Sequence, residues 1–169
     1  RQNGLEMNSL EVLQDKIVDD TKILQRIAHW RLKNAKIVFT NGCFDILHRG
    51  HIEYLAKAAS KGSKLIVGLN TDSSVRRNKG EERPLNDQYS RALSLSALGF
   101  VAGVVLFDED TPIEIIKKIK PDVLVKGADY ELENIVGADY VQANGGKIET
   151  IPLTEGYSTT ELINKIKHT

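Results

Sequence analysis

The sequence predicts an α/β protein with a doubly wound, five-stranded parallel sheet. Apolar runs rich in Val, Ile and Leu alternate along the chain with amphipathic segments of helical spacing. The apolar runs are nearly continuous, which is typical of strands that are buried on both faces of a parallel sheet. Polar residues follow directly after these runs, where open parallel sheets bind their ligands. We therefore expect a binding site along the carboxyl ends of the strands.

The expected elements follow from hydrophobic spacing and from residues that begin or end helices. Residues 9–32 have helical spacing as one or two helices, so we treat 1–34 as an N-terminal helical extension of an α/β domain at 35–169. Strands are expected at 36–40, 64–69, 101–107, 122–126 and 147–153. Helices are expected from about 51 to a stop at 62, at 86–98, from a capped start at Thr111-Pro112 to 119, at 136–144 and from 158. The polar stretch between 70 and 85 has no expected element.

Polar residues collect at the ends of the predicted strands. Because the carboxyl ends of parallel strands lie along one edge of the sheet, these residues should converge. They occupy positions 40–42, 70–72, 108–110, 126–129 and 154–160. Most of the polar chemistry of the chain is therefore expected on one rim.

Composition narrows the classes of function. With 169 residues, of which 41% are hydrophobic, the chain can bury a sizeable core. Its 23 basic and 23 acidic residues cancel, so no global field attracts nucleic acid or an anionic membrane, and we expect neither as a partner. The single cysteine fits a reducing compartment, and no segment resembles a signal peptide or a membrane span. These features favour a cytoplasmic protein with small-molecule substrates.

Two histidines frame a glycine in the segment TNGCFDILHRGHIEYL, residues 40–55. A zinc site would need further ligands, but the other histidines and the cysteine stand apart in the sequence, so we expect no metal held by the protein itself. His48 and His51 can flank an ordinary helix start. Gly50 would let a ligand approach the backbone closely, and a helix that begins here presents free N–H groups to an anion. We therefore favour a phosphate cradle.

The same segment resembles the HxGH signature of the nucleotidylyltransferase superfamily, and TEGYSTTELI (154–163) resembles its second nucleotide-binding segment. GLNTDSSVRRNKGEERPLNDQYSRA and PDVLVKGADY extend the resemblance to the adenylyltransferases of ADP-heptose biosynthesis, in stand-alone form or as the C-terminal half of a bifunctional enzyme. The resemblance covers roughly residues 37–166. It implies a Rossmann-like nucleotidylyltransferase fold and transfer of AMP from ATP to a heptose 1-phosphate for lipopolysaccharide core synthesis. ATP is then a co-substrate, and Mg²⁺ bridges its phosphates.

Resemblance and strand-end position together assign roles to the rim residues. Catalytic contacts to phosphate are expected from His48, His51, Lys79 and Arg91. Nucleotide contacts are expected from Thr40, Asn41, Gly42, Phe44, Asp45, Gly50, Lys126, Gly127, Asp129, Gly156, Ser158, Thr159 and Thr160. The sugar phosphate is expected to meet Asp72 and Arg83.

Local structure offers plainer explanations for several of these residues. Ser158 can begin a capping box with the glutamate three residues later. The cationic run at 76–83 includes two glutamates and can form a solvated loop. Arg91 lies one helical turn after an aspartate and can form a surface ion pair with it. Asp45 can anchor its own loop instead of contacting nucleotide.

Alternative functions depend on a few departures from related enzymes. Glycerol-phosphate cytidylyltransferases carry an arginine where this chain has Leu153, and commonly a tryptophan where it has Arg49. These differences weaken the hypothesis that this chain transfers CMP. Leu153 is expected near the nucleotide pocket without contacting phosphate. Nucleotidyl transfer to glycerol 3-phosphate, FMN or another sugar phosphate is the enzymatic alternative, and a nucleotide-sensing module is the non-enzymatic one. The N-terminal helices are the candidate surface of a homodimer.

Overall fold

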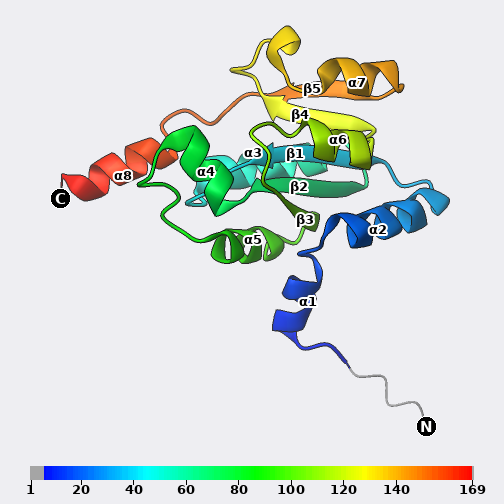
Figure 1. Cartoon of the computed structure of the whole chain (residues 1–169), viewed down its shortest axis with the longest axis horizontal. Helices are drawn as coiled ribbons and strands as arrows, with labels where there is room; N and C mark the ends of the chain where they lie inside the picture. Colours follow the sequence, from blue (N-terminus) through cyan, green and yellow to red (C-terminus); the bar gives the residue numbers. More distant parts are fainter. Residues whose placement is uncertain (1–5, 169) are drawn as a thin grey trace.

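The computed structural model describes residues 6–168, in which five parallel strands form one sheet covered by helices on both faces (Figure 1). The strands are β1 Ile37–Gly42, β2 Lys64–Asn70, β3 Val101–Phe107, β4 Val123–Gly127 and β5 Lys147–Ile151. Their order in the sheet is β3-β2-β1-β4-β5, so the direction of winding reverses between β1 and β4. The predicted fold class is confirmed, and each predicted strand is present.

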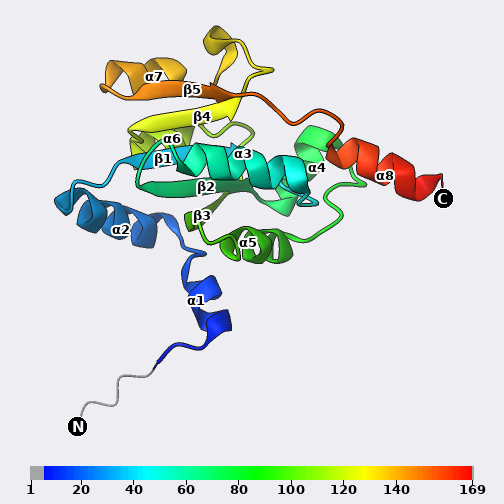
Figure 2. The same cartoon turned by 180° about the vertical axis from the view of Figure 1, so that it is seen from behind.

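Helices cover the two faces of this sheet in separate groups. They are α1 Ser9–Asp15, α2 Asp20–Leu32, α3 Arg49–Ala59, α4 Asp72–Lys79, α5 Gln88–Ser96, α6 Ile113–Ile119, α7 Ala138–Ala143 and α8 Thr159–Lys167, with a 3₁₀ turn at Leu132–Asn134. Helices α2, α6 and α7 pack on one face, and α3 and α5 pack on the other. Figure 2 shows the molecule from behind, with α3 in front of the sheet. None of the helices between residues 6 and 168 combines the length and apolarity needed to cross a membrane.

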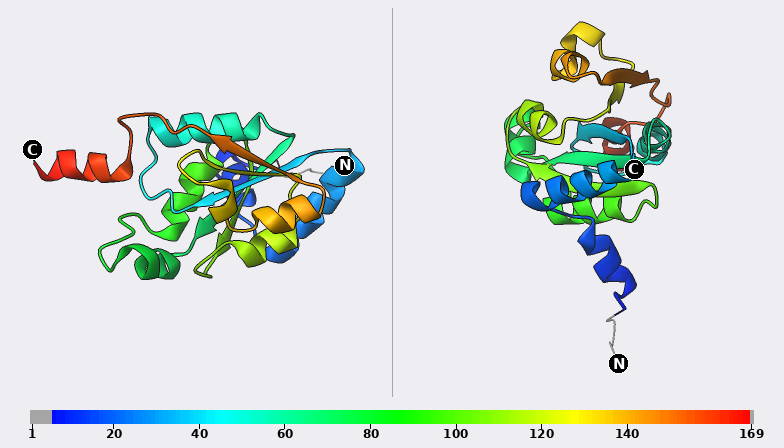
Figure 3. Two further views of the ribbon diagram at one scale, coloured as in Figure 1. Left: turned by 90° about the horizontal axis from the view of Figure 1, so that it is seen from above. Right: turned by 90° about the vertical axis from the view of Figure 1, so that its right-hand side faces the viewer.

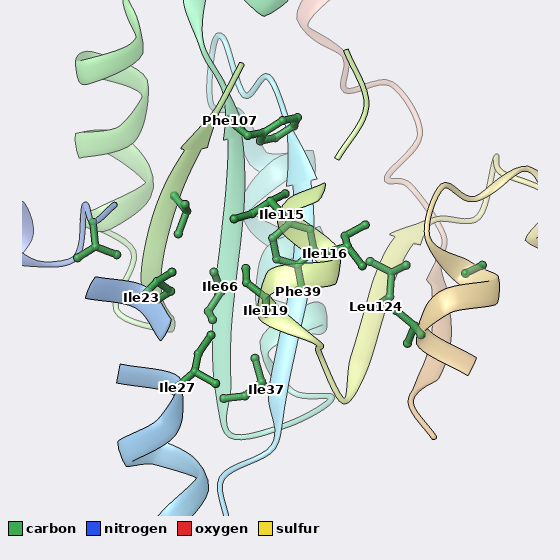
Figure 4. Close-up of a cluster of buried hydrophobic side chains, with 14 of the residues drawn as sticks. Ile23, Ile27, Ile37, Phe39, Ile66, Phe107, Ile115, Ile116, Ile119 and Leu124 are labelled. Carbon is green, nitrogen blue, oxygen red and sulfur yellow. The ribbon is translucent and has the colours of Figure 1, made fainter. Parts of the chain in front are cut away.

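A continuous apolar core holds α2 and α6 against the sheet. Ile23 and Ile27 of α2 are almost completely buried and share one cluster with Ile116 of α6 and Phe39 of β1. Figure 4 shows these side chains gathered over β1 and β2. Residues 1–5 of the predicted extension lie outside the described residues, and α2 is part of the same core as the sheet. The predicted limit at 34/35 is therefore not a break in packing.

The edge strand β3 is covered by the segment between α1 and α2. The backbone N–H of Val18 donates to the carbonyl of Val104 at 3.0 Å, and the N–H of Val104 donates to the carbonyl of Lys16 at 2.8 Å. Lys16 also donates from Nζ to the carbonyl of Ser96 at 3.0 Å. The segment thus satisfies backbone groups that an open sheet edge would leave exposed.

Several elements differ from the sequence prediction, and three of these differences have identifiable reasons. Helix α4 lies in the stretch expected to lack an element, because Val75 is its one buried apolar side chain and no periodicity is visible. Strand β5 ends before Pro152, which has no N–H to donate. The capped start predicted with Thr111 is wrong, because Pro112 itself is the N-cap of α6 and no side chain caps the helix. Helix α3 begins at Arg49 rather than near 51.

Candidate functional site

A cavity of about 360 Å³ opens at the carboxyl ends of the central strands, at the reversal point between β1 and β4. The structure brings most of the predicted site residues into its wall. These are Asn41, Gly42, Phe44, Asp45, His48, Gly50, His51, Lys79, Arg83, Lys126, Gly127, Asp129, Ser158, Thr159 and Thr160. Leu153 also lies in the wall, as predicted for a residue near the pocket. Segments far apart in the sequence therefore share one site.

The two histidines of HRGH form a stacked pair at the start of α3. His48 is the N-cap, and its Nδ1 accepts a hydrogen bond from the His51 backbone N–H at 3.3 Å. The rings lie 3.8 Å apart between centroids at an angle of 20°, and the Phe44 ring meets His51 edge-on at 5.3 Å. Because Nδ1 accepts, a neutral His48 carries its proton on Nε2. This leaves an Nε2–H available to donate to an anion in the cavity.

Burial disfavours the charged form of both imidazoles. Desolvation, with a smaller repulsion from His48, lowers the pKa of His51 from 6.5 to about 4. Burial likewise lowers the pKa of His48, although Glu161 opposes this shift. Nδ1 of His51 is buried and has no hydrogen-bond partner. The Ile46 backbone nearby raises the pKa of His51, but burial outweighs this effect. The pair is suited to binding an anion by hydrogen bonds, and an anion in the cavity beside the rings would favour their protonation.

We expect stability to depend on pH through His51. Its pKa in the unfolded chain is near 6.5 and in the folded chain about 4, so between these values the unfolded chain binds the proton first. The contribution of His51 to the free energy of unfolding should then be constant above about pH 7.5 and fall by about 3 kcal/mol as pH drops from 6.5 to 4. Urea unfolding of wild type and His51→Gln at several pH values measures this. An equally steep fall in the variant would contradict the assignment.

The second predicted segment begins α8 on the opposite side of the cavity. Ser158 is the N-cap of α8, and its Oγ accepts from the Glu161 N–H at 3.0 Å. The half of the capping box that would use the glutamate side chain is not formed. Thr159 and Thr160 follow in the first turn and line the cavity, so hydroxyls and free N–H groups of a helix start are both present. Two helix N-termini thus border the same space.

The β4 end supplies a close-fitting wall away from the histidines. A Cβ on Gly127 would lie 2.5 Å from Oδ1 of Asp129, so the backbone approaches the carboxylate closely here. Burial lowers the pKa of Lys126 to about 8, although Asp129 favours its charged form. Nζ of Lys126 lies 5.7 Å from the centre of the Tyr130 ring. A ligand with a flat ring and a sugar would meet the Gly127 backbone, the Asp129 carboxylate and the Tyr130 ring at this wall.

Asp45 anchors the loop 80–86, which carries Arg83. Its carboxylate accepts from the backbone N–H groups of Leu85 and Asn86 at 2.9 Å and from Nε of Arg83 at 2.7 Å. Burial alone would raise the pKa of this carboxyl, but the backbone donors and Arg83 together hold it below 3.8. The contacts of Asp45 therefore fit the role of a loop anchor. Arg83 lines the cavity while it is paired with Asp45.

Only part of the cationic run faces the cavity. Arg77 turns away to Asp110, with Nε to Oδ1 at 3.0 Å, and to Asp108. Lys79 lines the cavity, and its charge contributes to the low pKa of His51. Residues 76–79 of the run lie on α4, while 80–83 form the loop that follows it, and 76–82 are exposed.

Four predicted site residues, Arg91, Asp72, Thr40 and Gly156, lie outside the cavity wall, and their roles toward substrate stay predictions. Arg91 is 1% exposed and donates to the carbonyls of Cys43, Asn70 and Asn86 and to the Asp72 carboxylate. Its guanidinium has no free edge for phosphate, and Asp72 is occupied by the same ion pair. Both therefore make the contacts of scaffold residues.

Thr40 and Gly156 are the other two predicted site residues outside the wall. Thr40 is completely buried, and its hydroxyl is 2.8 Å from the Tyr54 hydroxyl, which in turn donates to the carbonyl of Val125. Gly156 has a φ of +76°, so it forms the turn before α8 and presents no side chain to the cavity.

Sequence reasoning missed several wall residues. Cys43, Tyr54, Tyr130, Thr154 and Tyr157 line the cavity without having been assigned a role, although 154–160 was expected on the rim. Tyr130 and Tyr157 lie within the quoted segments PDVLVKGADY and TEGYSTTELI, so aromatic residues in these segments were an available signal. Tyr54 lies on α3 one turn beyond His51, where a polar hydroxyl on an inward face was the only indication.

The pocket residues fit magnesium that is held mainly by a nucleotide. Between residues 6 and 168, no three His, Cys, Asp or Glu side chains come together as a metal cluster. Within the wall, the Asp45 carboxylate is already engaged by Arg83 and backbone N–H groups. Asn41 Oδ1, which is buried without a partner, and the Asp129 carboxylate are the oxygen atoms suited to such an ion.

A cytidylyltransferase-like family model matches residues 39–165, which spans both segments of the cavity. The chain belongs to this family. It is 47% identical over 163 residues to the bifunctional protein HldE of Koribacter versatilis, covering 96% of this chain and 34% of that protein. It is 59% identical over 132 residues to the bifunctional protein HldE of Campylobacter concisus, covering 78% of this chain and 27% of that protein. The chain thus spans about a third of the length of these relatives.

Two solved structures share the fold of this chain. The lipopolysaccharide core biosynthesis protein of Thermoplasma volcanium is 29% identical with a TM-score of 0.57, covering 73% of this chain and 99% of that chain. Pantoate-beta-alanine ligase of Francisella tularensis has a TM-score of 0.60 at 19% identity, covering 90% of this chain and 78% of that chain, and supports the fold alone. The predicted Rossmann-like nucleotidylyltransferase fold is confirmed.

Proposed function

We propose that this chain transfers AMP from ATP to a heptose 1-phosphate, releasing pyrophosphate and forming ADP-heptose for lipopolysaccharide core synthesis. The observation that carries the proposal is the meeting of the stacked His48–His51 pair and the first turn of α8 in one cavity. Such an arrangement suits a polyphosphate chain between two helix N-termini. The HldE relatives and the lipopolysaccharide core biosynthesis protein support a heptose as the acceptor.

The reaction needs positioning and charge stabilisation rather than a covalent intermediate. A phosphate oxygen of the sugar 1-phosphate attacks the α-phosphorus of ATP, the new P–O bond forms, and the α–β anhydride bond breaks as pyrophosphate leaves. Nε2–H of His48, the His51 ring and the ammonium of Lys79 supply donors to the oxygens on which charge develops. Ser158, Thr159 and the α8 N-terminus are placed to hold the leaving pyrophosphate.

Base and ribose are assigned to the β4 wall. The backbone around Gly127 can read the adenine edge, and the Asp129 carboxylate can hold a ribose hydroxyl. Mg²⁺ would neutralise phosphate charge in the bound nucleotide, with Asn41 Oδ1 or Asp129 as its protein contacts. We place this reaction in the cytoplasm, where ATP and sugar phosphates are available.

The proposal includes a homodimer that forms through α1, whose Leu10 side chain is half exposed.

The test is pyrophosphate release with magnesium, crossing ATP, CTP and GTP with heptose 1-phosphate, glycerol 3-phosphate and FMN. We expect release only with ATP and heptose 1-phosphate. Release with CTP and glycerol 3-phosphate, or with ATP and FMN, would replace the substrate assignment while retaining nucleotidyl transfer. Protein that binds nucleotide but releases no pyrophosphate with any pair would overturn the enzymatic proposal in favour of a sensing module.

A further inference from the structure

Helix α8 carries nucleotide-binding residues yet has no buried side chain. It extends away from the body of the protein in the left-hand view of Figure 3 and in Figure 1. The core therefore does not fix its position, and the preceding strand β5 ends at Ile151, several residues before Ser158. Contacts made by the connecting segment 152–158 must set where the first turn of α8 lies.

Two exposed residues of α3 reach this connecting segment. Oε2 of Glu53 accepts from Oγ1 of Thr154 at 2.8 Å, and Oε1 of the same carboxylate pairs with Nε of Arg49 at 2.6 Å. Cζ of Arg49 lies 5.5 Å from the centre of the Tyr157 ring, with Nη1 3.5 Å from the Tyr157 hydroxyl. One carboxylate and one guanidinium thus tie both ends of the segment to α3.

The first turn of α3 packs directly against the connecting segment 152–158. A Cβ on Gly50 would lie 3.1 Å from the Tyr157 Cβ and 2.9 Å from Cε1 of His48. Tyr157 is therefore packed directly over the glycine that separates the two histidines. Its position and the position of the phosphate cradle are mechanically linked.

We propose that Arg49 and Glu53 are positioning residues that hold the segment 152–158 in place, so that Ser158–Thr160 face the His48–His51 pair across the nucleotide. They act through Tyr157 and Thr154 and do not contact substrate. The inference rests on the proposed function for its kinetic readout, and it names a determinant of nucleotide affinity outside the cavity wall. Without these contacts the segment samples open positions, and apparent affinity falls in proportion to the closed fraction.

Kinetics and stability should respond differently to loss of these contacts. Arg49 and Glu53 are partly exposed, with side-chain exposures of 64% and 34%, so their removal should barely change the unfolding transition. Glu53→Ala and Arg49→Ala should each raise KM for ATP about 3- to 10-fold, with kcat within about twofold, because saturating ATP restores the closed state. Glu53→Gln, which keeps an acceptor for Thr154, should lie between Glu53→Ala and wild type.

The control is Glu114→Ala, which removes an exposed ion pair with Lys117 on α6, far from the cavity in the fold. Hydrogen exchange of the peptide covering 152–160 provides a readout independent of turnover. We expect faster exchange there in Glu53→Ala and Arg49→Ala, and wild-type exchange in Glu114→Ala. If wild type shows no turnover, the proposed function fails, but the exchange comparison still decides this inference. Wild-type exchange at 152–160 in both variants, or an unchanged KM for ATP in an active enzyme, would overturn it.

Discussion

His51→Ala is expected to lower kcat about 10²- to 10³-fold while leaving the fold intact. The ring contributes a donor that is fixed by stacking on His48 at 3.8 Å and by the edge of Phe44, so it costs little reorganisation when charge develops at the phosphates. His51 is a cleaner choice than His48, which is also the N-cap of α3, because removing a cap destabilises the helix by about 1 kcal/mol. Steady-state kinetics with ATP and heptose 1-phosphate, together with circular dichroism, measure both effects.

His29→Ala is the matched control, since His29 lies exposed on α2 outside the cavity wall. It should leave kcat unchanged. A folded His51→Ala protein with near-normal turnover would remove the imidazole from the chemistry and leave the cradle to the two helix N-termini and Lys79.

The strands were predictable because their signal lies in the sequence itself. β2 and β3 are apolar over most of their length, and buried parallel strands require this composition. Helix α4 was not predictable from periodicity, since its sequence DSSVRRNK offers a single apolar residue. Its evidence is local: Thr71 caps Ser74 N–H at 3.2 Å, and Gly80 ends the helix. Caps alone are weak signals in a polar stretch.

The candidate site was predictable in position but not in orientation. Strand-end placement and the two motifs correctly located the cavity, because topology brings all carboxyl ends to one rim. Sequence order does not show where a side chain at that rim points. Successive side chains in a strand face opposite sides, and Thr40 turns to Tyr54 of α3 while Asn41 turns to the cavity. Arg91 likewise reaches inward from α5 to backbone carbonyls that no pattern reveals.

Arg91→Ala is expected to destabilise the protein by about 3–5 kcal/mol, a large part of the total stability of a domain. The guanidinium joins the carbonyls of Cys43 at 2.8 Å and Asn70 at 2.9 Å, which follow β1 and end β2, and it pairs with Asp72 at 2.7 Å. Removing it leaves these acceptors buried without donors and the Asp72 charge unpaired. Urea unfolding, with comparison of midpoints and slopes, measures the loss.

Arg77→Ala separates this effect from general loss of an arginine, because Arg77 is 45% exposed and pairs with exposed aspartates. It should cost no more than about 1 kcal/mol. Arg91→Lys should be intermediate, since an ammonium can pair with Asp72 but cannot reach three carbonyls with a planar fork. If Arg91→Ala instead unfolds within about 1 kcal/mol of wild type while kcat collapses, the side chain leaves its buried position to meet phosphate during turnover. The catalytic role expected from the sequence would then be correct, and the scaffold role assigned from its hydrogen bonds would be wrong.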